Sequence, residues 1–369
     1  MNLDSAVRAA HHVFSDTYFE AREKLLAAMP GSTAYPCSAK GPAGEALYTD
    51  ATYFGNPNAS KLLILVSATH GAEGYCGSAA QLLFLHARLH EQLPPSTAVL
   101  LIHALNCYGF AWNRRVTAEG CDLNRNFVDF SKPVPENLGY EELAEHFVPA
   151  DISQQGLQEA EAAIAEFRSL HGEKEFMTAR MSGQYSRPGG LFYGGTNPTE
   201  ARRTLEQIAS DFDIAGREEI VIIDYHTGIG PYGYGDLMTE MDSGEAGYRR
   251  AVKIFGPSVT SPNFDGFAAV AVHGSQDAFW QRLLGDRHTY VALEFGTFGH
   301  EQGRQLMRND HWLFMYKPEQ AVSPLGREIR NACKVHWYPQ RLDWKEMILW
   351  RSHQVHRQAV EALTSSASR

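Results

Sequence analysis

The sequence lacks the features that mark several large classes of protein. No segment of its 369 residues approaches the ~20 consecutive apolar residues that span a bilayer. No run of Lys or Arg is longer than two and the formal net charge is -10, which disfavours a nucleic-acid or anionic-membrane surface. The first residues also lack the basic and apolar regions of a signal peptide. We therefore expect a soluble protein without nucleic-acid or membrane partners.

Cysteine is scarce, and its spacing suggests no metal or redox pair. The five cysteines form no C-x-x-C motif, and their number is odd. In a chain of this length, such usage predicts free thiols in a reducing compartment. The cytoplasm is the expected location.

No internal repeat and no low-complexity tract interrupts the sequence before its last five residues, SSASR. We therefore expect one domain over residues 1–369, with a core at about 45–320. Apolar positions at helical spacing, among them Val7, Val13 and Leu25, predict a helix over roughly the first 28 residues. The C-terminal part should form a helical extension.

Four apolar runs have the length of strands, at residues 62–67, 98–104, 220–225 and 290–295. Helix-like stretches lie between and after them, at residues 77–93, 154–170, 199–212 and 343–363. Continuous apolar runs are typical of strands that are covered on both faces. The alternation predicts an α/β domain with a mostly parallel central sheet.

Each predicted strand runs into polar side chains that are capable of chemistry. Because open α/β sheets bind ligands at the carboxyl ends of their strands, these side chains should share one crevice. In chain order they are His70 and Glu73, Asn106, Asp224 and His226, and Glu294.

Two imidazoles and one carboxylate are a common ligand set for a catalytic zinc, and His70, Glu73 and His226 supply one. The alternative is that each histidine is structural and Glu73 caps a turn. Glu294 ends an apolar strand, where an unpaired carboxylate is costly to bury. It could be a general base beside a metal, or an acid paired with an arginine.

The segment 106–127 concentrates cationic and amide side chains in an acidic protein. It carries Arg114, Arg115, Asn124 and Arg125. Guanidinium groups bind carboxylates in a bidentate manner and stabilise developing oxyanions. A solvated, ion-paired loop is the alternative.

Four short motifs occur in the order seen in zinc carboxypeptidases. They are HGAE at 70–73, DLNRNF at 122–127, DYHTG at 224–228 and LEFGT at 293–297. The sequence therefore resembles the zinc carboxypeptidase superfamily, especially its succinylglutamate desuccinylase and aspartoacylase side and a bacterial metallopeptidase-like branch. This resemblance, over about residues 60–300, implies a three-layer α/β/α fold with a mostly parallel, mixed sheet.

The resemblance also implies a role for each matching residue. His70, Glu73 and His226 match the zinc ligands, and Glu294 matches the catalytic glutamate. The other implied roles are carbonyl polarisation by Arg115, with Arg114 as its near rival, binding of a substrate carboxylate by Asn124 and Arg125, and orientation of zinc-bound imidazoles by Asp122 and Asp224.

The sequence departs from the resemblance at one motif. Peptidases of the superfamily commonly have Asn-Pro-Asp-Gly where this chain has Asn106-Cys107-Tyr108-Gly109, which leaves peptide specificity open. The Gly-rich segment 183–195 carries Arg187 and Tyr193 as further candidates for substrate contact. A plain surface turn is the alternative for that segment.

Three other functions can be compared with the sequence. GIGPYG at 228–233 fits the dinucleotide pattern G-x-G-x-x-G, although Pro231 lies inside it and a poor helix start follows. A serine hydrolase would need a G-x-S-x-G motif, which the chain lacks. A carboxypeptidase-like module that binds a ligand without cleaving it is the non-enzymatic alternative.

We therefore expect a zinc-dependent hydrolase of amide bonds with one Zn²⁺ per chain, either carboxypeptidase-like or an N-acyl amino acid deacylase. Its substrate should be a small molecule or short peptide with a free carboxylate.

Overall fold

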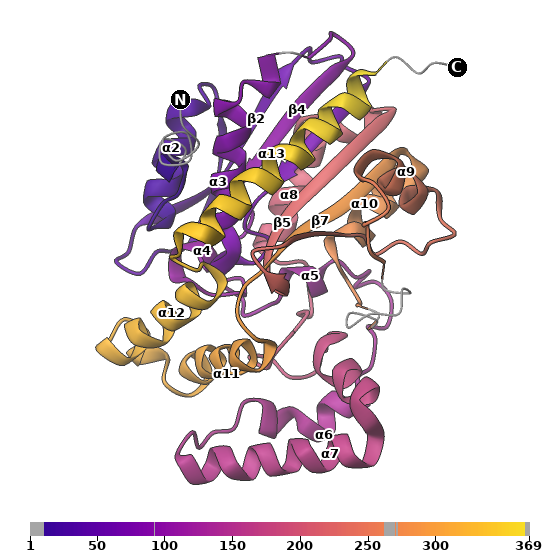
Figure 1. The fold of residues 1–369 in the computed structure, drawn as a ribbon. Helices are drawn as coiled ribbons and strands as arrows, with labels where there is room; N and C mark the ends of the chain where they lie inside the picture. The colour runs from indigo at the N-terminus through magenta and orange to yellow at the C-terminus, as the bar shows by residue number, and fades with distance from the viewer. Residues whose placement is uncertain (1–10, 92, 262–269, 271, 366–369) are drawn as a thin grey trace.

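The computed structural model describes residues 11–91, 93–261, 270 and 272–365, and its centre is a seven-stranded sheet (Figure 1). The strand order is β1-β2-β4-β3-β5-β7-β6. The strands are β1 (Thr33–Lys40), β2 (Ala46–Gly55), β3 (Lys61–Val66), β4 (Thr97–His103), β5 (Glu219–Tyr232), β6 (Gly235–Met238) and β7 (His288–Gly296).

The four strands predicted from apolar runs are the parallel centre of the sheet. They are β4, β3, β5 and β7, and each pairs in parallel with its neighbour. The strands β1, β2 and β6 are antiparallel and make the sheet mixed. They were not predicted because β1 alternates between exposed and half-buried positions and β6 has only four residues.

Helices cover both faces of the sheet, which confirms the three-layer α/β/α arrangement (Figure 1). Leu63 and Leu65 pack in one apolar cluster with α3 and α13, whereas Leu62 and Ile64 pack in another with α8 and α10. This two-sided burial explains the unbroken apolar runs. The helices on the two faces include α2 (Tyr18–Ala28), α3 (Gly74–His86), α8 (Glu200–Asp211), α9 (Ala246–Phe255), α10 (Gln276–Leu284) and α13 (Leu342–Thr364).

A further group of helices has its own apolar cluster beside the sheet, and we call it the helical layer (Figure 1). It consists of α6 (Leu138–Phe147), α7 (Gln154–Met181), α11 (His300–Tyr316) and α12 (Pro324–Trp337). The short helices α4 (Cys107–Trp112) and α5 (Leu123–Asn126) lie in the connection that follows β4.

The N-terminal helix is shorter than the sequence pattern predicts. It begins at Tyr18, where the side chain of Thr17 accepts a hydrogen bond from the Glu20 N–H. This N-cap is the start signal that the apolar spacing did not reveal. Val13 is buried ahead of the helix, and Val7 lies outside the described residues.

All five cysteines are free thiols, as predicted. Within the described ranges, no helix is both long and apolar enough to cross a bilayer.

His103, at the end of β4, should make the protein sensitive to acid. Neither of its ring nitrogens has a partner among the described residues, and burial lowers its pKa to about 3. The unfolded chain, with a pKa near 6.5, binds the proton first, so stability is complete above that pH and is lost as the pH falls toward 3. Between pH 7 and 5, the free energy of unfolding should fall by about 2 kcal/mol less in His103→Phe than in the native protein.

Urea unfolding at both pH values measures this difference. An equal loss in the two proteins would show that His103 is not the acid-sensitive group.

Candidate metal centre

The ends of three neighbouring strands bring the predicted metal ligands together. His70 follows β3 and precedes a short 3₁₀ turn, Gly71–Glu73, which carries Glu73 to the start of α3. His226 lies in β5, directly opposite Glu294 of β7. All four side chains are buried. These four predicted residues therefore lie at one cavity, whereas Asn106, which was predicted to share the crevice, lies beside a separate small cavity.

The three candidate ligands present their donor atoms to one another. His226 Nδ1 lies 3.2 Å from His70 Nδ1 and 3.0 Å from Glu73 Oε2. His70 Nδ1 lies 3.1 Å from Glu73 Oε1. Among the residues that the structure describes, these three form the one group of His, Cys, Asp or Glu side chains close enough to share a metal ion.

A carboxylate stands behind each imidazole. His70 Nε2 lies 3.1 Å from Asp122 Oδ1, and His226 Nε2 lies 2.9 Å from Asp224 Oδ2. Asp224 is itself held by the Thr69 hydroxyl, at 2.8 Å from Oδ1. Carboxylates in this position fix the tautomer and orientation of metal-binding histidines.

The donor set fits a zinc ion. If each Nε2 carries the proton that its carboxylate accepts, each Nδ1 turns a lone pair toward Glu73 and the other ring. Lone pairs that meet in a buried space are unfavourable unless a cation lies between them. Two histidines and one carboxylate, whose donor atoms all lie within 4.8 Å of one another, would leave zinc an open fourth position.

Arg115 lies beside this group. Its Nε donates to Asp122 Oδ2 at 2.8 Å and its Nη1 to Glu73 Oε1 at 3.3 Å. Its Nη2 lies 2.8 Å from His70 Nε2. When that nitrogen carries a proton for Asp122, it cannot also accept from Arg115, so the N–H groups of Arg115 Nη2 are left for a ligand.

Glu294 faces the same cavity and has an unusually high proton affinity. Its Oε1 accepts a hydrogen bond of 2.9 Å from the Ile229 N–H. Burial and the nearby charge of Glu73 raise the pKa of Glu294 to about 8. No arginine pairs with it among the described residues, so the alternative of a buried Glu–Arg pair is not supported.

Asn124 and Arg125 also line the cavity. Arg125 donates to the Met181 carbonyl through Nε at 3.1 Å and Nη2 at 2.7 Å, and to the Asn124 carbonyl through Nη1 at 2.9 Å. Asn124 Oδ1 accepts from the Gln276 N–H at 3.0 Å. These bonds fix both side chains and leave N–H groups of each for a ligand.

Three predicted substrate contacts do not line the cavity. Arg114 donates to Asp310 at 2.9 Å, and its guanidinium lies 3.4 Å from the ring centroid of Phe314. Arg187 pairs with Glu141 at the surface, and Tyr193 is buried. Arg114 and Arg115 are adjacent in a loop, and their side chains bind different partners, Asp310 and Asp122.

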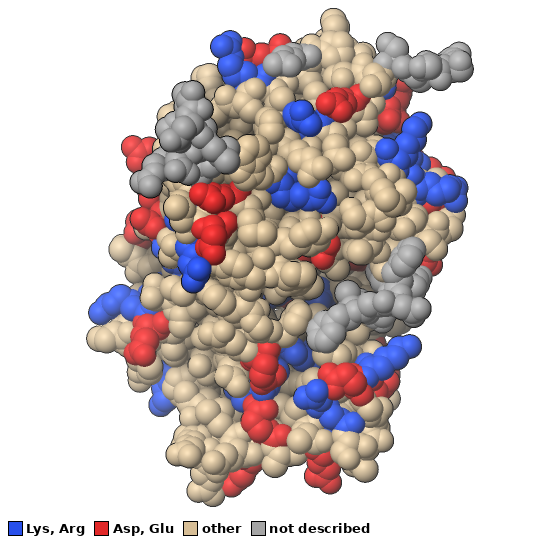
Figure 2. Space-filling model, in the orientation of Figure 1, with Lys and Arg blue, Asp and Glu red and all other residues tan. Residues whose placement is uncertain are grey.

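The cavity has a volume of about 560 Å³, within the usual range for small-molecule sites of ~300–1,000 Å³. It lies between the sheet and the helical layer, where the surface is hollowed (Figure 2). Several of its polar residues were not predicted, among them Arg180, Glu240, Arg304 and His336. They lie on segments without a motif, so only the fold brings them to the site.

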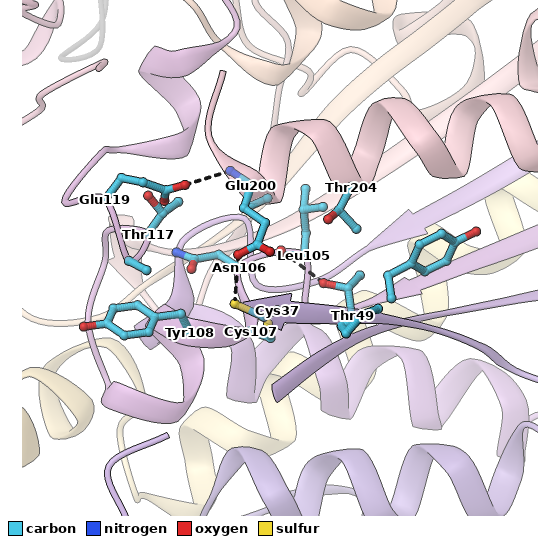
Figure 3. Close-up of a pocket in the computed structure, with 14 residues that line it drawn as sticks. Cys37, Thr49, Leu105, Asn106, Cys107, Tyr108, Thr117, Glu119, Glu200 and Thr204 are labelled. Atoms are coloured by element: carbon cyan, nitrogen blue, oxygen red, sulfur yellow. Dashed lines mark hydrogen bonds between the residues drawn. The ribbon is translucent and has the colours of Figure 1, made fainter. Parts of the chain in front are cut away.

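A second, much smaller cavity of about 20 Å³ lies beside Asn106 and Cys107 (Figure 3). It has room for about one water molecule. Asn106 Nδ2 donates to the Arg115 carbonyl at 3.2 Å, and Asn106 Oδ1 caps α4 by accepting from the Gly109 N–H. The segment that departs from Asn-Pro-Asp-Gly thus supports Arg115 from behind.

Two of the three glycines of 228–233 lie in the continued strand β5, and Gly233 lies in the turn that follows it. Gly228, Gly230 and Gly233 have positive φ angles of 130°, 96° and 70°, and β5 extends to Tyr232. The next element is β6, so the segment provides no helix N-terminus for a pyrophosphate. The structure therefore does not support a dinucleotide site here.

The loops after β3 and β4 touch through their backbones. A Cβ on Gly71 would lie 2.0 Å from the carbonyl carbon of Gly109. The Gly71 and Ala72 N–H groups donate to the Arg115 and Arg114 carbonyls at 3.3 and 2.8 Å. Contact this close fixes His70 and Arg115 relative to each other.

Gly71→Ala should therefore destabilise the protein by about 3 kcal/mol, the upper end of the range for overpacking, and weaken zinc binding through His70. Urea unfolding measures the first effect. Gly244→Ala is the matched control, because a Cβ there meets nothing within 4 Å. Equal free energies of unfolding for Gly71→Ala and Gly244→Ala would show that the backbone contact at Gly71 does not exclude a Cβ.

The sequence matches the family described as "Protein of unknown function (DUF2817)" over residues 14–351. The chain belongs to this family. No curated protein matches the DUF2817 chain.

Several solved structures are similar to the chain. Bovine thrombin-activatable fibrinolysis inhibitor, solved with tick carboxypeptidase inhibitor, has 13% identity and a TM-score of 0.44 over 88% of this chain and 97% of its own. A candidate metallopeptidase from Shewanella amazonensis has 14% identity and a TM-score of 0.44 over 94% of each chain. Murein-tripeptide amidase MpaA from Escherichia coli O157 has 16% identity and a TM-score of 0.34 over 85% of this chain and 94% of its own. Because these similarities are low, the chemistry of the site is inferred from the positions of its own residues.

Proposed function

We propose that the chain is a zinc-dependent hydrolase of amide bonds. The observation that carries this proposal is the convergence of His70 Nδ1, His226 Nδ1 and the Glu73 carboxylate beside Glu294 in a cavity of about 560 Å³. A metal-binding group and a carboxylate of high proton affinity, both facing one cavity, are the parts that amide hydrolysis requires.

His70, Glu73 and His226 would hold the ion, with Asp122 and Asp224 fixing the imidazoles from behind. When bound there, zinc would lower the pKa of a water molecule toward ~7 and polarise a carbonyl group. A cation at this position also favours the carboxylate form of Glu294.

Glu294 is then the general base and acid. Its carboxylate takes a proton from the attacking water and later gives it to the leaving nitrogen. The bond from Ile229 N–H to Oε1 fixes the carboxylate and leaves Oε2 to move the proton. Arg115 donates an N–H of Nη2 to the oxygen of the carbonyl group as negative charge develops there.

Asn124 and Arg125 would bind a carboxylate of the substrate. Arg125 is buried, and the Met181 and Asn124 carbonyls hold its guanidinium in place. A preorganised cation of this kind orients the substrate at little entropic cost. Both a C-terminal peptide residue and an N-acyl amino acid carry such a carboxylate.

The test is hydrolysis by zinc-loaded protein of a mixed panel, with short peptides that have free C-termini set against N-acyl amino acids. Release of C-terminal residues would identify a carboxypeptidase, and release of acyl groups a deacylase. The Glu294→Gln protein is the blank. Failure to cleave any member, by a protein that holds zinc, would contradict the proposal and favour a ligand-binding module.

A further inference from the structure

The fold brings together two cysteines that are far apart in the sequence. Cys37 lies in β1, at the edge of the sheet, and Cys107 begins α4, which packs against β1. Both line the small cavity of about 20 Å³, where Figure 3 shows their side chains next to each other. Cys107 belongs to the apolar cluster on one face of the sheet, and Cys37 packs against that cluster. Neither thiol has a part in the proposed hydrolysis.

The two thiols are in hydrogen-bonding contact, and their proton affinities differ. Hydrogen bonding with the Cys107 thiol lowers the pKa of Cys37, although burial and the charge of Glu200 act against this. The same hydrogen bond, together with burial, raises the pKa of Cys107. The proton that the pair shares therefore stays on Cys107, and Cys37 is the thiol that ionises first. Because the thiolate is the nucleophile, Cys37 is the reactive member of the pair.

Exposure distinguishes the two cysteines in the same sense. Cys37 is half-buried, so a small oxidant reaches its sulfur from the solvent, whereas Cys107 is buried. An accessible cysteine of lowered pKa beside a second cysteine is the arrangement in which a first oxidation product is captured as a disulfide. The pair thus has both the attacking and the resolving thiol.

The surroundings allow the Cys37 thiol to change its partner. In its protonated form, Cys37 Sγ donates to Glu200 Oε2 at 3.4 Å. The Glu200 carboxylate also accepts from the Ser38 N–H, at 3.0 and 3.1 Å from its two oxygens, and from the Ser38 hydroxyl at 2.8 Å. Loss of the thiol proton therefore leaves Glu200 hydrogen-bonded, and only one weak contact is given up.

We propose that Cys37 and Cys107 form a reversible disulfide when the protein meets hydrogen peroxide. The Cys37 thiolate attacks one peroxide oxygen, so that an S–O bond forms and the O–O bond breaks, and the departing hydroxide takes up the proton that Cys37 lost and becomes water. The Cys107 sulfur then attacks the sulfenic sulfur of Cys37. An S–S bond forms, the S–O bond breaks, and the departing hydroxide leaves with the Cys107 proton as a second water. Two electrons pass from the two thiols to one peroxide molecule.

The disulfide would join the edge of the sheet to the segment behind the metal centre. Cys107 follows Asn106, whose Nδ2 donates to the Arg115 carbonyl at 3.2 Å. The bond would also close a long loop of the chain and so restrict the unfolded state. Because the two thiols are already in contact, we expect the link to form without rearrangement of the fold and to stabilise it.

The test is treatment of the full chain with hydrogen peroxide, followed by alkylation of the remaining thiols and peptide mass spectrometry. A peptide pair linked through Cys37 and Cys107 should appear, and two of the five free thiols should be lost. A dithiol reductant should restore both. The Tm of the oxidised protein should be at least about 3 °C above that of the reduced protein.

Single variants separate the two roles. In Cys37→Ser, Cys107 should stay reduced under the same treatment. In Cys107→Ser, Cys37 should accumulate as a sulfenic acid that dimedone traps, because the resolving thiol is missing. Cys121→Ser is the matched control, because Cys121 is buried like Cys107 but lies outside the small cavity, and burial raises its pKa to about 12. This variant should form the Cys37–Cys107 disulfide as the native protein does.

Four results would overturn the proposal. They are oxidation of Cys37 to a sulfinic acid while Cys107 remains a free thiol, a disulfide of Cys37 between two molecules, a sulfenic acid trapped on Cys107 in Cys37→Ser, and a lower Tm for the oxidised protein. The last would mean that the bond strains the fold. None of these measurements depends on hydrolysis, so their outcome is independent of the proposed function.

Discussion

Glu294→Gln should retain zinc and lose at least ~10²-fold in kcat, the usual contribution of a positioned acid and base. The amide keeps the shape of the carboxylate and can still accept from the Ile229 N–H, so the backbone around the metal ligands should not move. What it loses is the ability to take and return a proton. Single-turnover hydrolysis of the best substrate of the panel, together with zinc content by atomic absorption, measures both effects.

Glu219→Gln is the control for this variant. Glu219 begins β5 at the opposite end of the sheet and pairs with Lys61, so its amide should leave kcat unchanged. Near-normal turnover by Glu294→Gln would remove Glu294 from the mechanism. Loss of zinc from that variant would instead show that Glu294 supports the metal.

His226→Ala should abolish tight zinc binding and, with it, activity. The variant removes one of three proposed ligands. Its zinc affinity should therefore fall by more than the ~10–100-fold that follows mutation of a residue hydrogen-bonded to a ligand. Asp224→Asn supplies that smaller effect for comparison, because Asp224 accepts from His226 Nε2 without facing the ligand group. Competition for zinc against a chromogenic chelator ranks the three proteins.

His288→Ala is the matched control. His288 is buried like His226 and also has an aspartate at Nε2, Asp277 at 3.1 Å, but its Nδ1 lies 2.7 Å from the Gly285 carbonyl rather than beside other ligands. It should retain zinc. A His226→Ala protein that binds one zinc as tightly as native protein would mean that the third ligand is misplaced.

The candidate metal centre could be located from the sequence because its residues lie at the ends of strands. His70 and Glu73 are three residues apart at the end of one buried run, and His226 and Glu294 end two others. Once buried runs are placed in parallel, their ends must meet. The pairing of His226 with Glu294 across β5 and β7 confirms this inference.

The remaining wall of the cavity could not be predicted, because it depends on how distant helices pack. Arg180 and Arg304 lie in amphipathic sequence where an arginine is usually a solvated side chain. Their burial follows from the assembly of the helical layer, where Glu161 of α7 pairs with Arg304 of α11, and no short motif records this arrangement. Arg187 and Tyr193 were predicted to contact substrate because they lie in the Gly-rich segment, but the packing of the chain places them outside the cavity.

The backbone contact at Gly71 has a consequence for how such a protein can diverge. The loops that carry His70 and Arg115 are joined by main-chain hydrogen bonds, whereas the opposite wall of the cavity comes from the side chains of the helical layer. Substitutions on that wall can change which molecules are accepted while the main chain keeps the reactive groups aligned. In the proposed hydrolase, substitutions in the helical layer can therefore produce a new substrate specificity. The residues of the proposed reaction stay in place, because other segments hold them.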